Sequence, residues 1–170
     1  VSMLSSMIAR EMDWTSSDKL FLISIAGLFH DIGKKDLPPD ILEKNPSELT
    51  EKEREEYEKH PEIGAELIKE LGVFPNGTEQ IVIHHHECVD GSGFPNGFGR
   101  VKIHSVAKII NLADQFIHVK NALLVKCKKV DPEQVVAELE YRKTEFESEH
   151  FSALCRLFKL QKPRKQGLAS

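Results

Sequence analysis

The chain has 170 residues, of which 40% are hydrophobic and 29% are charged. This is the range of one ordinary globular domain and is too short for two well-buried ones. The net charge of −4 argues against general electrostatic attraction to DNA or to an anionic membrane. No apolar run approaches the roughly 20 residues that a membrane-spanning helix requires.

The three cysteines, Cys88, Cys127 and Cys155, are widely separated and form no CxxC pair. This pattern favours reduced thiols and a cytoplasmic location over a disulfide framework or a structural zinc site. The chain opens at Val1, already within a helical pattern and without a signal segment. We therefore expect a piece of a longer protein, or a chain processed upstream.

The first half of the chain is predicted to form a series of helices. Ser17 or Asp18 can cap the second of them, and Thr50 with Glu53 has the spacing of a capping box. Pro61 is expected to break or kink the chain after the capped helix. From apolar spacing, caps and breakers, the expected helices cover residues 1–8, 21–28, 51–60 and 62–71 and a segment that begins near 78.

The second half begins with a loop over 90–99, whose four glycines and one proline are incompatible with regular structure. A largely apolar helix over 103–117 is expected to be central, and two more helices should follow over 132–146 and 149–160. No repeated period-two strand pattern occurs. The sequence therefore predicts an all-α bundle of about seven helices over 1–160, followed by a basic flexible tail over 161–170.

Histidines and carboxylates recur at or near the ends of separate predicted helices. Facing helices that each contribute one or two such donors are the usual way to build a metal centre inside a bundle. Imidazole and carboxylate together suit iron, manganese or zinc. Hydrogen-bonded core histidines, or an exposed polar helix end, remain alternatives for parts of the set. The candidate residues are His30, Asp31, His60, His84, His85, His86 and Asp114, with His84 expected to face elsewhere.

An ordered set of motifs between about residues 21 and 116 resembles the HD-GYP branch of the HD phosphohydrolase superfamily. The set consists of His30-Asp31-Ile32-Gly33-Lys34, His60 with Gly64, His85-His86-Glu87, the loop Asp90-Gly91-Ser92-Gly93-Phe94-Pro95, and Ala107-Lys108-Ile109 leading to Asp114. The resemblance implies an HD-type helical bundle with a metal centre. It also implies hydrolysis of cyclic di-GMP, to linear pGpG or GMP, by a hydroxide that bridges two divalent ions, with iron first and manganese as the alternative.

The resemblance also assigns residues to roles. Asp31 would bridge the ions, and Lys34 would lie by the scissile phosphate and act with Asp31 in catalysis; a cation that caps a helix end is the alternative for Lys34. The implied metal ligands are His30, Asp31, His60, His85, His86 and Asp114. The implied substrate-binding residues are Lys34, Gly91, Ser92, Gly93, Phe94 and Lys126.

Three features depart from the family pattern. Phe94 stands where the family has Tyr, and Leu123 stands where it has a phosphate-gripping Arg. Only the later basic position of the family pattern is kept, as Lys126. No histidine precedes His30, so a third metal is not expected and an upstream helix is expected to be missing.

These departures leave open a degenerate HD-GYP signalling module that binds metal and a nucleotide with little turnover. Its partner would be a diguanylate-cyclase-type protein or an upstream sensory domain. An HD phosphohydrolase that acts on a mononucleotide is disfavoured by the loop motif.

Overall fold

A computed structural model describes residues 1–160 of the chain. This part contains nine α-helices and three short 3₁₀ helices; its one pair of β-bridge residues, Asp90 and Gly99, belongs to no strand. The predicted all-α class is confirmed. The helices outnumber the expected seven partly because a single turn, α3 (Pro39–Leu42), forms between the helices predicted over 21–28 and 51–60. The predicted tail over 161–170 lies outside the described residues.

Two paired helices open the chain, α1 (Ser2–Arg10) and α2 (Ser17–Phe29). The cap of α2 is Ser16, one residue before the predicted position, and its side chain accepts a hydrogen bond from the backbone N–H of Lys19. At its other end α2 runs directly into the 3₁₀ helix η1 (Ile32–Asp36). The junction between α2 and η1 carries the predicted His-Asp pair.

A second group consists of η2 (Pro46–Glu48), α4 (Glu51–Tyr57), α5 (His60–Leu71) and α6 (Thr78–His84). The predicted capping box at the start of α4 is confirmed: the side chain of Thr50 accepts from the N–H of Glu53, and the side chain of Glu53 accepts from the N–H of Thr50. Pro61 does not lie in the break between α4 and α5; it occupies the first turn of α5, where its missing N–H has no partner to lose. His60 therefore opens α5 instead of closing α4.

The longest helix, α7 (Ser105–Lys126), is central, as predicted, but it begins two residues later than expected and runs nine residues further. It carries Ile109, Ile110, Leu112 and Ala113 into the core, where none is exposed to solvent. Beyond it, α8 (Pro132–Glu140) is shorter than the predicted helix over 132–146, whose last part forms η3 (Lys143–Glu145). The last described helix is α9 (Ser148–Leu157).

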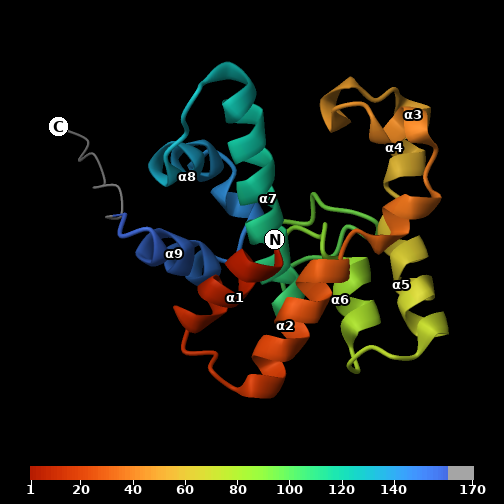
Figure 1. Cartoon of the computed structure of the whole chain (residues 1–170), viewed down its shortest axis with the longest axis horizontal. Helices are drawn as coiled ribbons and strands as arrows, with labels where there is room; N and C mark the ends of the chain where they lie inside the picture. Colours follow the sequence, from red (N-terminus) through yellow and green to blue (C-terminus); the bar gives the residue numbers. More distant parts are fainter. Residues whose placement is uncertain (161–170) are drawn as a thin grey trace.

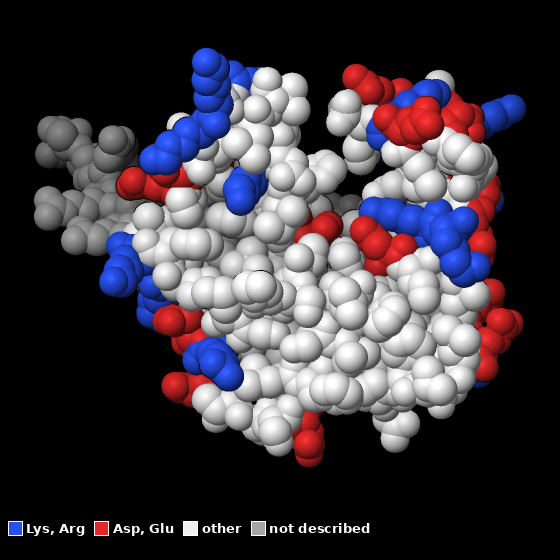
Figure 2. Space-filling model, in the orientation of Figure 1, with Lys and Arg blue, Asp and Glu red and all other residues white. Residues whose placement is uncertain are grey.

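Two projections rise above the body of the molecule, one formed by α8 and the C-terminal half of α7 and the other by α3 and α4 (Figure 1). Figure 2 shows a hollow between these projections, with acidic atoms near its base and basic atoms beside them. Within residues 1–160, no helix is both long enough and apolar enough to cross a membrane.

Candidate metal centre

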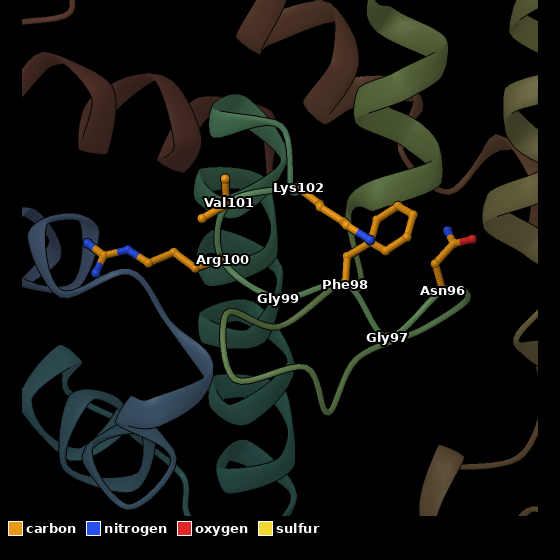
Figure 3. A pocket seen from close by; sticks show the side chains of 7 residues that line it. All are labelled: Asn96, Gly97, Phe98, Gly99, Arg100, Val101 and Lys102. Carbon is orange, nitrogen blue, oxygen red and sulfur yellow. The ribbon is translucent and has the colours of Figure 1, made fainter.

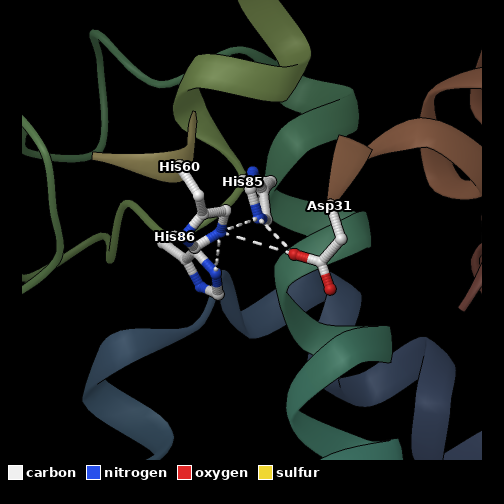
Figure 4. Close-up of side chains that lie close together, drawn as sticks. All are labelled: Asp31, His60, His85 and His86. Atoms are coloured by element: carbon white, nitrogen blue, oxygen red, sulfur yellow. Dashed lines mark hydrogen bonds and ion pairs between the residues drawn. The ribbon is translucent and has the colours of Figure 1, made fainter. Parts of the chain in front are cut away.

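The Asp31 carboxylate is the point at which histidines from three segments meet. Its Oδ1 atom lies 3.4 Å from Nε2 of His60 and 3.5 Å from Nε2 of His85. Its Oδ2 atom lies 3.4 Å from Nε2 of His30, the residue that ends α2. Figure 4 shows Asp31 facing His60, which opens α5, and His85, which follows α6.

The same hydrogen bond orients three of these rings. In His30 and His60, Nδ1 lies 3.0 Å and 2.7 Å, respectively, from the backbone carbonyl oxygen three residues earlier, and Nδ1 of His85 contacts the carbonyl of Val82 in the same way. A carbonyl oxygen can only accept, so each Nδ1 carries the proton and donates it. In the neutral imidazole, each Nε2 then keeps a lone pair, and each Nε2 faces Asp31.

The Nε2 atoms of His60, His85 and His86 lie close enough together to share one cation. Nε2 of His60 lies 3.4 Å from Nε2 of His85 and 3.1 Å from Nε2 of His86. Because Nε2 of His60 and of His85 are both unprotonated, no hydrogen bond joins them, and Asp31 Oδ1 has no hydrogen-bond partner. One ligand atom from each of Asp31, His60, His85 and His86 lies within 4.8 Å of the others. This donor set fits a divalent metal ion.

His30 and Asp114 lie on the other side of Asp31. Oδ1 of Asp114, on α7, is 3.5 Å from Nε2 of His30, a buried atom without a hydrogen-bond partner. Neither residue belongs to the four-residue group around Oδ1 of Asp31. The six predicted ligands are thus brought to one place, but in two sets that share Asp31.

The electrostatics of the site favour the protonation states that bind metal. Burial would raise the pKa of Asp31, but its close contacts with the imidazoles of His60 and His85 and the charge of Lys34 outweigh burial and hold this pKa well below its usual range. Burial lowers the pKa of His85, and the pKa of His86 falls well below the usual value, so both rings are neutral near pH 7. Burial also opposes ionisation of Asp114, yet contact with His30 leaves its pKa lowered.

Lys34 reaches the site from η1. Its Nζ donates a hydrogen bond to Oδ2 of Asp31 over 2.7 Å. Burial favours the neutral amine, but the charge of Asp31 more than offsets this and raises the pKa of Lys34, which keeps the ammonium charged. Lys34 therefore lies beside the donor set and not at a solvated helix end.

Sequence reasoning gave no role to Tyr57, the last residue of α4. Its backbone carbonyl holds His60, and its ring centre lies 4.9 Å from that of His60. Its hydroxyl interacts with the ammonium of Lys34, and burial raises its pKa. The available signal was its position three residues before a candidate histidine ligand, the spacing at which a carbonyl meets Nδ1.

The glycine-rich loop over 90–99 is held against the histidines by two side chains. The ring of Phe94 stacks on His86 with their centres 4.5 Å apart. The buried carboxylate of Glu87 accepts hydrogen bonds from the backbone N–H groups of Asn96 and Phe98, each over 2.8 Å. Glu87 belongs to a motif of the sequence, but its role was not predictable because its partners lie nine and eleven residues further along the chain.

The remaining substrate-binding candidates are placed differently. Ser92 bonds Asp90 through both its hydroxyl and its N–H, and Gly91 has a φ of 84°, so both shape the loop. Gly93 packs on the backbone of residues 86–88, where a Cβ atom would lie 2.3 Å from the carbonyl oxygen of His86. Lys126 ends α7 about 18 Å along the helix axis from Asp114. Contact of these residues with a substrate stays a prediction.

Two other features lie apart from the donor set. His84 faces away from it, as expected: its Nδ1 accepts a hydrogen bond from the backbone N–H of His104. A surface pocket of about 400 Å³ is lined by residues 96–102, none of which is a candidate ligand. Figure 3 shows these lining side chains. Two of the residues that line this pocket contact each other: Lys102 lies over the ring of Phe98, with Nζ 5.3 Å from the ring centre.

Comparison with known proteins identifies the family. A model of the HD domain matches residues 1–149. The chain belongs to the HD domain family. The resemblance drawn from the motifs is confirmed, since the HD domain matches most of the chain.

Two curated relatives illustrate the similarity. The cyclic di-GMP phosphodiesterase response regulator RpfG of Xanthomonas campestris is 34% identical over 117 residues, which are 68% of this HD domain chain and 30% of RpfG. The 3′3′-cGAMP-specific phosphodiesterase 3 of Vibrio cholerae is 32% identical over 116 residues, or 68% of the chain and 25% of that protein. The chain thus spans less than a third of the length of either relative.

Among solved structures, the HDG"Y"P protein Bd1817 from Bdellovibrio bacteriovorus superposes with a TM-score of 0.75. The alignment covers 93% of this HD domain chain and 50% of Bd1817, at 21% identity. This likeness supports the HD-type helical fold.

Proposed function

We propose that residues 1–160 form a metal-dependent phosphodiesterase domain that hydrolyses cyclic di-GMP. The observation that carries this proposal is the convergence of histidine Nε2 lone pairs and the Asp31 carboxylate at one point, with no proton between His60 and His85. Two relatives of this chain are named as phosphodiesterases of cyclic dinucleotides, which supports the substrate class.

The two sets of donors suggest two ions. His60, His85 and His86 would hold one with Oδ1 of Asp31, and His30 and Asp114 would hold the other with Oδ2. Iron is the first candidate and manganese the second, because both accept mixed imidazole and carboxylate ligands. When bound, such a pair supplies Lewis-acid activation of water and of the phosphoryl group.

The residues around this centre have separate tasks. The imidazoles of His60 and His85 are fully buried, whereas the side chains of Asp31 and Lys34 are 33% and 27% exposed, so the site has one open side. The ammonium of Lys34 lies on that side, where it can stabilise negative charge that develops on phosphoryl oxygens. The Phe94 ring covers His86 from the loop and offers a flat apolar surface to a base or a sugar.

The direct test is incubation of the purified chain with cyclic di-GMP and Fe²⁺ or Mn²⁺, with product analysis by chromatography. We expect linear pGpG or GMP, and no product from Asp31→Ala under the same conditions. Parallel reactions with 3′3′-cGAMP measure the preference between cyclic dinucleotides. Absence of turnover of cyclic di-GMP by a chain that is loaded with metal would reject the proposal.

That negative outcome would select the second candidate function, a module that binds metal and a nucleotide or a partner protein with little turnover. The observation in its favour is the loss of two polar groups: Phe94 lacks a hydroxyl, and Leu123 packs against the hydrophobic core. Binding of cyclic di-GMP without hydrolysis would identify this function.

A further inference from the structure

Tyr57 is a polar group beside the donor set that the proposed mechanism leaves unused. It is half-buried at the end of α4, and its ring lies against that of His60. Nζ of Lys34 lies 5.2 Å from the centre of the Tyr57 ring and interacts with its hydroxyl. Tyr57 thus lies next to both Lys34 and the His60 ligand.

The donors and acceptors of this pair can be counted. An ammonium has three N–H donors and no acceptor, and Lys34 gives one of them to Asp31. In its contact with Lys34 the phenol oxygen of Tyr57 must therefore accept, which leaves the phenol O–H to donate elsewhere. Within residues 1–160, no acceptor is paired with this O–H. The chain therefore presents an N–H of Lys34 and the O–H of Tyr57 side by side without a protein acceptor.

We propose that Tyr57 is a phosphate-binding residue, whose hydroxyl donates to an oxygen of the same phosphate that Lys34 contacts. The two donors come from α4 and η1, which meet at the start of α5, so a phosphodiester oxygen is the acceptor that both can share. Tyr57 also supplies, from α4, a phenol at a site where the loop contributes only the phenyl ring of Phe94. This inference rests on the proposed function, because it deepens the assignment of a phosphodiester to this site.

Tyr57→Phe tests the inference, because it removes only the hydroxyl. The ring against His60 and the backbone carbonyl that holds His60 both remain. The chain offers a matched control in its second tyrosine, Tyr141, which is 88% exposed and follows α8. The readout is the affinity of the Mn²⁺-loaded chain for inorganic phosphate, measured by calorimetry, which needs no turnover.

We expect Tyr57→Phe to weaken phosphate binding about tenfold, the value of one hydrogen bond to a charged group, with manganese content unchanged. Tyr141→Phe should leave the affinity unchanged. In a Lys34→Ala background, Tyr57→Phe should cost less than it does alone, since Lys34 orients the hydroxyl.

Equal phosphate affinity of the wild type and Tyr57→Phe would overturn the inference, and so would a wild type that binds metal but no phosphate. Failure of the proposed function would give a different result. In that case phosphate binding would still depend on Tyr57, but the chain would not hydrolyse cyclic di-GMP.

Discussion

Gly33 packs directly on the backbone of His60. A Cβ atom at position 33 would lie 2.0 Å from the carbonyl oxygen of His60 and 2.6 Å from the amide nitrogen of Gly64. This contact presses η1 against the first turn of α5 and brings Asp31 next to His60. The shape of the site therefore depends on a residue with no functional group.

Gly33→Ala is expected to destabilise the fold by about 3 kcal/mol or more, because the methyl group meets backbone that cannot rotate away. It should also reduce metal content by moving Asp31. Urea unfolding and metal analysis measure the two effects. Gly99→Ala is the control, since a Cβ atom there has nothing within 4 Å, and it should change stability by less than about 1 kcal/mol. Equal stability of the two variants would contradict the packing argument.

Lys34→Ala should leave the metal bound and lower the kcat/KM of phosphodiester hydrolysis about 100-fold, because it removes a fixed positive charge beside the site. Lys35→Ala is a close control: Lys35 is the next residue, is exposed, and pairs with Asp36 instead of with Asp31. The measurement is steady-state kinetics with metal content determined in the same samples. If both variants keep the full rate, Lys34 serves only to neutralise Asp31.

Glu87→Gln should destabilise the chain by about 1 to 3 kcal/mol. The two carboxylate oxygens of Glu87 accept from the N–H groups of Asn96 and Phe98, and an amide would place an NH₂ group against one of these donors. Chemical denaturation measures the loss, with the exposed Glu149→Gln as the comparison. A stability equal to that of the wild type would show that the carboxylate does not hold the loop.

The buried His150 is expected to contribute to the pH dependence of the free energy of unfolding of this chain. Burial lowers its pKa to about 4, whereas an unfolded histidine titrates near 6.5. As the pH falls from 6.5 to 4, the unfolded chain takes up a proton at this position and the folded chain does not, so the free energy of unfolding falls. Glu147, Lys108 and Arg100 are the charged groups that act on this ring.

The expected contribution of His150 is about 2 to 3 kcal/mol across that range. It is the difference between the stability profiles of the wild type and His150→Phe, measured by denaturation at several pH values with the same metal content. Subtraction removes the contributions of the other buried histidines. Parallel profiles between pH 7 and pH 4 would refute the assignment.

Much of the fold could be predicted from local signals. The capping box of Thr50 and Glu53 and the left-handed Gly72, with a φ of 62°, mark real helix ends because the responsible contacts lie within a few residues. The end of α8 was not predictable in this way. Phe146 continues the apolar spacing and is buried, but its backbone is extended, with a φ of −110° and a ψ of 151°.

In the candidate site, too, some residues could be predicted from the sequence and others could not. Motif order pointed to the six candidate ligands, and the structure brings them together around Asp31. The roles of Tyr57 and Glu87 could not be predicted, because they arise from tertiary contacts. The phenol of Tyr57, on α4, interacts with Lys34, on η1. The carboxylate of Glu87 accepts from backbone N–H groups that carry no sequence signal.

The most direct test of the account is the number of metal ions that the chain binds. Equilibrium dialysis against Mn²⁺ or anaerobic Fe²⁺, followed by elemental analysis, should give two ions per chain for the wild type. Asp31→Ala should give none, because its carboxylate joins both donor sets. Asp36→Asn, which alters an exposed carboxylate nearby, should keep both ions. A wild type that binds less than one ion, or an Asp31→Ala variant that retains two, would contradict the account.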